Sequence, residues 1–193
     1  MTEMLQHSEA DLIDRARKGS VDAFEQLVLK YQDRLYRFLL VRAASGADAE
    51  DALQESFVAA FKYLPSYKAR FQFSTWLFTI AIRQLGRLKS DIASPQTPLD
   101  SIVSEDPGPQ QTGIQSEQRQ SLWQIAKDHL GEAQFTAIWL FYVEDMPIKE
   151  IGVAMKRPVS WVKVNLMRAR QTLSRVLADT HYEHSAVGGE VIL

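Results

Sequence analysis

The chain contains no cysteine among its 193 residues. This absence excludes a disulfide scaffold and any metal site built on thiolates, and it is compatible with a reducing cytoplasm. No uncharged apolar run approaches the roughly 18 residues that a membrane span needs, and residues 1–14 lack the apolar core of a secretory signal. Because 46% of the residues are hydrophobic, the chain can still bury cores without metals or disulfides. We therefore expect a cytoplasmic protein with no membrane insertion.

The formal net charge is only -2, but acidic and basic residues are unevenly distributed along the chain. Some long segments have no acidic residue, and others have no Lys or Arg. Residues 151–178 hold six Lys or Arg and no acid, and residues 62–90 also hold six and none. Conversely, residues 43–61 and 91–118 have no Lys or Arg. Such local basic excess is typical of surfaces that face phosphates. DNA is therefore the first partner to consider.

Helical periodicity and capping residues dominate the chain, and we find no alternating strand pattern. The predicted fold class is all-α: an N-terminal helical bundle and a C-terminal helix-turn-helix domain, joined by a flexible acidic linker. Residues 91–118 contain five acids and four of the seven prolines, a composition that cannot offset its ordering entropy with a core. The predicted domains are residues 1–92 and 118–178, with a linker at 93–117 and a tail at 179–193 in which we predict no helix. The helices expected in the first domain cover residues 8–18, 20–45, about 48–64 and 74 to about 89, the last capped by Ser74.

The predicted helix at residues 48–64 is acidic on one side. Helical spacing places Leu53, Phe57 and Phe61 with Ala60 and Leu64 on a core face, and Asp48, Asp51 and Glu55 opposite. One interpretation is structural, with Asp48 and Asp51 as a capping pair and Glu50 favoured by the helix dipole. It does not account for Glu55. An acidic docking face for a basic partner is the functional interpretation, and a carboxylate metal site is disfavoured because no Glu-x-x-His motif is present.

Residues 62–90 interleave cations with aromatic rings, which is how single-stranded nucleic acid is held. The alternative is that the rings fill a small core, which we favour for Phe78 and leave open for Phe71 and Phe73. Helical spacing places Trp76, Ile80, Arg83 and Arg87 together, away from the core. The candidate DNA-binding residues of this segment are Lys62, Arg70, Phe71, Phe73, Ser74, Trp76, Arg83 and Arg87.

Residues 130–177 read as a helix-turn-helix, with Lys156-Arg157-Pro158 as the turn. In the last helix Val162, Leu166 and Ala169 form a core stripe with Leu173, Val176 and Leu177, which turns a basic face outward toward a major groove. The alternative is a solvated basic helix on an ordinary helical domain. Candidate residues for contacts with duplex DNA are Lys156, Arg157, Ser160, Trp161, Lys163, Val164, Met167, Arg168 and Gln171, with Arg175 as a further phosphate contact.

Three motifs in this order resemble the bacterial sigma factors of the extracytoplasmic-function (ECF) type, over about residues 10–177. Residues 48–55 (DAEDALQE) resemble the segment that grips the clamp helices of the polymerase β′ subunit. Residues 73–81 (FSTWLFTIA) resemble the start of the helix that opens and reads the minus-ten promoter element. Residues 161–170 (WVKVNLMRAR) resemble the minus-thirty-five recognition helix.

The resemblance implies an alternative sigma factor with no catalytic residue, metal or cofactor of its own. Its expected partners are core RNA polymerase, through the β′ clamp helices and the β flap, promoter DNA, and an anti-sigma factor that controls it. The residues expected to bind core polymerase are Asp48, Glu50, Asp51, Gln54 and Glu55. Departures from the family pattern at Arg83, Arg87, Trp161, Val164, Asn165 and Met167 mean that the promoter sequence cannot be carried over.

Two other classes of protein remain as alternatives. A helix-turn-helix regulator that acts without polymerase would leave the acidic and the basic-aromatic helices unexplained. A sigma mimic that sequesters an anti-sigma factor would not need a basic recognition surface. An enzyme is the remotest class, because His181 and His184 have only Glu183 nearby as a potential ligand.

Overall fold

The computed structural model describes the backbone of residues 8–92 and 114–187, and the side chains of residues 8–87 and 122–178. Within these ranges every regular element is helical, which confirms the predicted all-α fold class. The chain divides into two compact units, residues 1–104 and 105–193. Most of the predicted linker, residues 93–113, lies outside the described residues.

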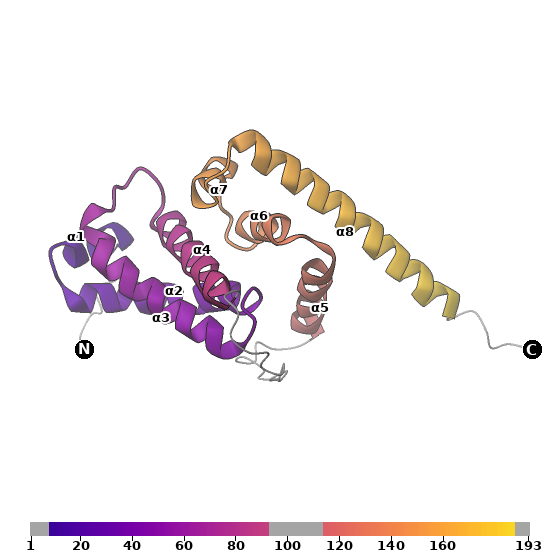
Figure 1. The fold of residues 1–193 in the computed structure, drawn as a ribbon, viewed down its shortest axis with the longest axis horizontal. Helices are drawn as coiled ribbons and strands as arrows, with labels where there is room; N and C mark the ends of the chain where they lie inside the picture. Colours follow the sequence, from indigo (N-terminus) through magenta and orange to yellow (C-terminus); the bar gives the residue numbers. More distant parts are fainter. Residues whose placement is uncertain (1–7, 93–113, 188–193) are drawn as a thin grey trace, which may run out of the picture. The chain divides into compact units, whose positions relative to one another are not determined.

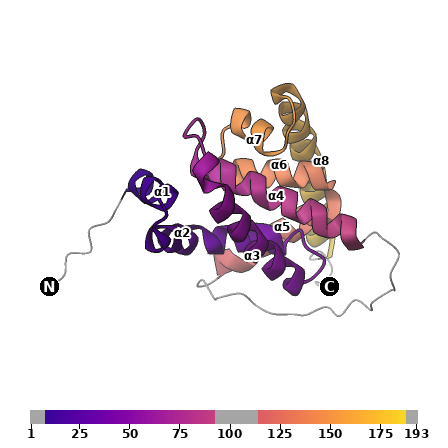
Figure 2. The ribbon, with the colours of Figure 1, turned by 60° about the vertical axis from the view of Figure 1, so that its left-hand side comes forward.

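The N-terminal unit is a bundle whose helices lie side by side in Figures 1 and 2. Its elements are α1 (Glu9–Arg17), α2 (Val21–Leu40), α3 (Gly46–Tyr63), a 3-10 turn η1 (Leu64–Ser66) and α4 (Phe73–Ile92). α2 packs against α1, α3 and α4, and α3 also packs against α4. The apolar residues of α2 recur at helical spacing, and the core that they form with α4 includes an edge-to-face pair between Phe38 and Phe78, with ring centroids 5.2 Å apart.

Serine hydroxyls cap the first three helices, since the side chains of Ser8, Ser20 and Ser45 each accept a hydrogen bond from the backbone N–H three residues later. The predicted capping role of Asp48 is therefore wrong. α3 begins two residues earlier than expected, and the Asp48 carboxylate accepts a hydrogen bond from the Ser45 hydroxyl at 2.9 Å. Ser74 is also not a cap, because α4 begins at Phe73 and Ser74 lies inside its first turn.

The connection between α1 and α2 is a tight turn. Gly19 adopts a left-handed φ of 97°, which glycine does without steric cost. The N–H groups of Gly19 and Ser20 donate to the carbonyls of Ala16 and Arg15 at 3.0 and 3.1 Å, so the last carbonyls of α1 are satisfied. Ser20 then caps α2.

The buried face of α3 differs from the predicted one. The fully buried positions are the small residues Ala49, Ala52, Ser56 and Ala60, whereas Leu53 and Phe57 are half-buried and Phe61 is exposed. Small side chains let the backbone of α3 approach its neighbours closely. The larger apolar residues are consequently placed at the edge of the helix interface instead of its centre.

The C-terminal unit contains α5 (Ile114–His129), α6 (Glu132–Tyr142), α7 (Ile148–Ala154) and α8 (Val159–Val187). Two predicted boundaries are wrong here: α5 begins inside the predicted linker, and α8 continues through residues 179–187, where no helix was predicted. Both ends are polar, and composition alone gave little sign of a helix. Trp123 and Trp139 pack with centroids 4.8 Å apart, while Val162, Leu166 and Ala169 of α8 are buried, as predicted.

The turn between α7 and α8 requires a glycine at position 152. The N–H of Arg157 donates to the carbonyl of Gly152 at 2.8 Å. A Cβ added to Gly152 would lie 2.8 Å from the backbone oxygen of Arg157, closer than such atoms can approach. The contact involves backbone on both sides, so a larger side chain can be accommodated only if the turn moves.

We predict that Gly152→Ala lowers the free energy of unfolding of the C-terminal unit by roughly 1–3 kcal/mol, because the added methyl group forces this displacement. Urea unfolding followed by tryptophan fluorescence measures it. Gly86→Ala is the control: nothing lies within 4 Å of the new Cβ in α4, and this helix-favouring change should not lower stability. Equal stabilities for Gly152→Ala and the wild type would contradict the proposed steric conflict.

Candidate nucleic-acid interface

α8 presents a basic face opposite its buried stripe. The residues predicted to contact duplex DNA from this helix and the preceding turn are mostly exposed: Lys156, Arg157, Ser160, Lys163, Val164, Met167, Arg168 and Gln171. Val164 and Met167 are exposed by 40% and 49%. The face therefore offers cations for phosphates together with apolar groups that can touch bases.

Trp161 differs from this group because it is half-buried. The Arg157 guanidinium lies 5.2 Å from the centre of its ring, and the Trp161 backbone carbonyl accepts a hydrogen bond from the side chain of Asn165 at 2.9 Å. The prediction that Trp161 points outward is thus only partly right. Its ring supports Arg157 at the start of the exposed face.

Arg170 was counted in the basic excess of α8, but it is bound within the unit. Its Nε donates to the Tyr142 hydroxyl at 2.8 Å, and its guanidinium lies 5.4 Å from the Phe141 ring and 5.5 Å from the Tyr142 ring. These contacts tie α8 to α6 from outside the core. Lys163 and Arg168 are exposed in the N-terminal half of α8.

Lys156 adopts a strained conformation at the helix-turn-helix turn. Its φ is 53°, in the left-handed region that favours glycine. Its N–H donates to the Val153 carbonyl at 3.2 Å, which closes the end of α7. A long basic side chain therefore occupies a position where glycine would be more stable.

In the N-terminal unit, all four predicted minus-ten cations are exposed: Lys62, Arg70, Arg83 and Arg87. Phe71 is half-buried, with the Arg70 guanidinium 5.6 Å from its ring centre. This cation–aromatic pair lies in the loop before α4. It combines the two features expected of a surface that holds unstacked bases.

Phe73 and Ser74, which were also predicted to contact minus-ten DNA, are buried, with exposures of 2% and 8%. Phe73 packs against Tyr67 and Trp76, with ring centroids 5.6 and 5.5 Å away. Ile80, predicted on the outer side, is buried too, whereas Trp76 is half-buried. Phe78 is fully buried, as predicted.

The acidic residues of α3 form an exposed face made by Glu50, Asp51, Gln54 and Glu55. Asp48 is half-buried and engaged with Ser45, so it belongs to the cap. Beside this face a shallow groove runs between α2 and α3, and its surface is mainly apolar. The groove is lined by Phe24, Val28, Gln32, Glu50, Leu53, Gln54, Phe57, Val58 and Phe61.

The family is indicated by comparison with known proteins. Residues 27–91 match the family model described as sigma-70 region 2, and residues 126–173 match that for sigma-70 region 4. The chain is 30% identical over 180 residues to the ECF RNA polymerase sigma factor SigW of Bacillus subtilis strain 168, covering 86% of this chain and 95% of the relative. The chain belongs to the ECF sigma factors.

Two solved structures share the fold of this sigma factor. CnrH, solved in complex with the cytosolic domain of CnrY, has a TM-score of 0.65 and 21% identity, covering 87% of this chain and 96% of that one. The sigma factor RpoE of Bartonella quintana, solved with the anti-sigma factor NepR, has a TM-score of 0.61 and 21% identity, covering 82% and 98%.

The groove residues Phe24, Val28 and Val58 of this sigma factor were missed by the reasoning from sequence. The sequence did contain a sign of this groove. Leu53, Phe57 and Phe61 recur at helical spacing, and Val58 lies beside them, so the apolar surface of α3 is wider than one core-facing stripe. Among residues 8–87 and 122–178, no three His, Cys, Asp or Glu side chains come together as metal ligands. None of the described helices is both long and apolar enough to cross a membrane.

We predict that Arg170→Ala lowers the free energy of unfolding of the C-terminal unit by about 1 kcal/mol, because it removes a hydrogen bond and two cation–aromatic contacts. Thermal unfolding followed by circular dichroism measures the loss. Arg168→Ala is the matched control on the same helix and should change stability by less than about 0.5 kcal/mol. Equal losses for the two variants would be inconsistent with a structural role for Arg170.

We also predict that Lys156→Gly raises the free energy of unfolding by about 1 kcal/mol, because glycine relieves the left-handed strain. Arg157→Gly, one position later, should instead destabilise the unit, since it loses the contact with Trp161 without relieving strain. Urea unfolding of the two variants tests this contrast, and a loss of stability in Lys156→Gly would refute it.

Proposed function

We propose that this sigma factor binds core RNA polymerase through the acidic face of α3 and directs it to promoters with the basic surfaces of its two units. The observation that carries the proposal is the exposed basic face of α8, set on a buried stripe in a helix-turn-helix of the sigma-70 region 4 family. The sigma factor supplies no catalytic residue, because polymerisation belongs to the core enzyme. It acts in the cytoplasm, where that enzyme works.

The polymerase contact is assigned to Glu50, Asp51, Gln54 and Glu55. These side chains are exposed on one helix, and no Lys or Arg occurs from residue 43 to residue 61 to neutralise them. A complementary basic surface on the β′ clamp helices would be steered toward them by charge. Ser45 caps α3 and also donates a hydrogen bond to the Asp48 carboxylate, which holds the start of the face in place.

The promoter contacts are assigned to two surfaces. Lys62, Arg70, Phe71, Trp76, Arg83 and Arg87 bind the opened minus-ten strand, with Phe73 supporting them from the core. The exposed face of α8 enters the major groove at the minus-thirty-five element, with Lys163 and Arg168 on phosphates and Ser160, Val164, Met167 and Gln171 toward bases. The β flap holds the C-terminal unit on the polymerase.

Control by an anti-sigma factor completes the proposal. The Bartonella sigma factor of the same fold was solved with its anti-sigma factor NepR. In this chain the acidic face of α3 and its neighbouring groove are exposed in the absence of a partner, so an inhibitor that covers them would compete with polymerase. A regulator acting without polymerase would leave this acidic face unused, and a sigma mimic would not need the basic face of α8.

We predict that Asp51→Arg weakens binding to core polymerase about tenfold or more, because it places like charges in the contact. Fluorescence anisotropy of labelled sigma factor titrated with core enzyme measures the affinity. Asp33→Arg makes the same charge change at an exposed position of α2 outside the groove and should bind like the wild type. If the wild-type chain fails to join core polymerase, the proposed function is wrong.

We predict that Arg168→Ala lowers run-off transcription about three- to tenfold on promoters selected from a library by the wild-type holoenzyme, because a phosphate contact is lost. Core binding should be unchanged. Lys18→Ala removes one exposed charge from the N-terminal unit and serves as the control. Promoter-specific binding by the free chain without polymerase would favour the regulator class instead.

A further inference from the structure

A pocket lined by both polar and apolar side chains lies in the N-terminal unit and has no role in the proposed function. It lies between α1, α2, the loop before α4 and the start of α4. Its wall includes Glu9, Lys30, Tyr31, Arg34, Tyr67 and Phe73. Glu9 precedes residues 27–91, the segment that matches sigma-70 region 2. The pocket brings α1 next to the loop before α4, the loop that contains Arg70 and Phe71.

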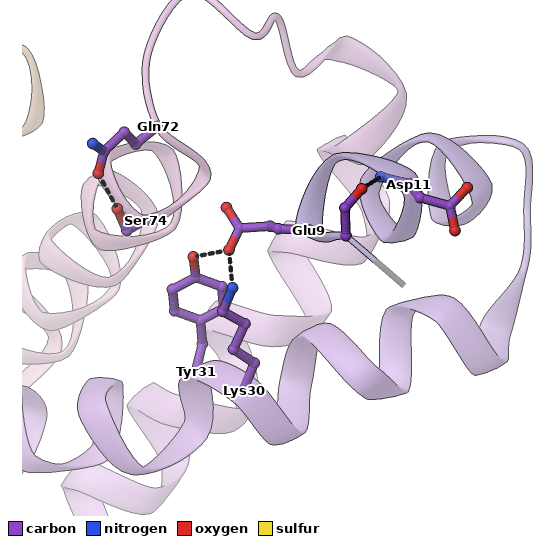
Figure 3. Close-up of polar contacts among 7 residues, drawn as sticks. Glu9, Asp11, Lys30, Tyr31, Gln72 and Ser74 are labelled. Carbon is purple, nitrogen blue, oxygen red and sulfur yellow. Dashed lines mark hydrogen bonds and ion pairs between the residues drawn. The ribbon is translucent and has the colours of Figure 1, made fainter. Parts of the chain in front are cut away.

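Glu9 binds two residues of α2 at once, as Figure 3 shows. Its Oε2 accepts a hydrogen bond from the Tyr31 hydroxyl at 2.8 Å and another from the Lys30 ammonium. Partial burial acts to raise the pKa of Glu9, but these hydrogen bonds and the charges of Lys30 and Arg34 outweigh it, so the pKa is lower than its ordinary value. The carboxylate is consequently ionised wherever the protein is folded near neutral pH.

Tyr31 is fixed by these contacts. Its exposure is only 3%, and the Lys30 ammonium and the Arg34 guanidinium lie 5.7 and 5.6 Å from its ring centre. Burial raises the pKa of the Tyr31 hydroxyl, as do its hydrogen bond to Glu9 and the Glu9 charge. Tyr31 therefore remains a hydrogen-bond donor, and Glu9 is its acceptor.

The Tyr31 ring continues into an aromatic cluster that reaches the DNA-binding surface. Its centroid is 5.5 Å from that of Phe73, and Phe73 contacts both Tyr67 and Trp76. The Tyr67 hydroxyl donates to the backbone carbonyl of Phe71 at 2.8 Å. The cluster thus ends at Phe71 and Trp76, the two half-buried aromatic residues assigned to unstacked bases.

We propose that Glu9 is a positioning residue for promoter opening: it holds Tyr31, and Tyr31 sets the rings and the loop backbone that place Phe71 and Trp76. The inference rests on the proposed function of that surface. Without the carboxylate, the Tyr31 hydroxyl and the Lys30 ammonium lose the acceptor that they share. Phe71 and Trp76 then remain on the minus-ten surface, but their rings are no longer held in place. Binding of this surface to single-stranded DNA is therefore weaker.

The test uses holoenzyme assembled from the full chain and core polymerase. Its probe is the labelled single-stranded non-template strand of a promoter selected by the wild-type holoenzyme. We expect Glu9→Ala and Tyr31→Phe each to lower affinity about five- to tenfold. The double variant should be no weaker than either single one, because both remove the same hydrogen bond. Glu9→Gln keeps an acceptor oxygen and should recover part of the loss, whereas binding to core polymerase should not change.

A spectroscopic readout separates positioning from general destabilisation. The chain has four tryptophans, and Trp76 is the one in the N-terminal unit. Incorporated fluorotryptophan gives a ¹⁹F signal for Trp76 that Trp76→Phe identifies. We expect Glu9→Ala to shift this signal at temperatures where the variant is fully folded. Glu25→Ala, which removes an exposed carboxylate from α2 outside the pocket, should leave both signal and affinity unchanged.

The outcomes distinguish the two proposals. If the wild-type holoenzyme selects no promoter, the proposed function fails and this inference fails with it. If the wild type binds the strand and Glu9→Ala binds it equally well, the inference alone is overturned. Additive losses in the double variant, or lower stability with an unshifted Trp76 signal, also overturn it.

Discussion

The close approach of α3 to its neighbours is the constraint on which the N-terminal unit depends. It is possible because Ala49, Ala52, Ser56 and Ala60 occupy the buried face, where larger residues would hold the helices apart. In the same packing, Leu53 and Phe57 lie at the rim of the interface, and Glu50, Asp51 and Glu55 are exposed. An apolar groove and an acidic face thus arise side by side from one choice of small residues.

The accuracy of reasoning from sequence varied with the physical signal. In α8, Val162, Leu166 and Ala169 were predicted correctly as buried because apolar residues that recur at helical spacing fill a core, whereas Leu173, Val176 and Leu177 of the same predicted stripe are half-buried. On α3 the same prediction from helical spacing failed. It places the most hydrophobic residues in the core, whereas the buried positions of α3 are occupied by small residues. The ends of α5 and α8 were missed because polar helical turns leave little periodic trace. Ser45 was overlooked as a cap because the acids that follow it also favour a helix start.

Charge counting located exposed charged faces, but it also counted charges that are bound within the units. Arg170 belongs to the basic segment, yet it is held between Phe141 and Tyr142. Lys30 and Glu9 bind each other, and Phe73 lies in the core beneath the rings that it was grouped with. These assignments depend on contacts between residues distant in sequence, which no local pattern encodes. The exposed members, such as Asp51 and Arg168, were identified correctly as surface residues because a helical face alone decides their exposure.

The turn between α1 and α2 bears on how the chain can change in length. Lys18 ends one helix, Gly19 takes the left-handed conformation, and Ser20 caps the next, so each of the three residues already has a structural task. An inserted or deleted residue here would break the cap or the turn and rotate α1 about its axis, carrying Glu9 away from Tyr31. The number of residues at this joint, and not the Lys18 side chain, therefore sets where Glu9 lies, because Lys18 contributes its backbone N–H to the end of α1.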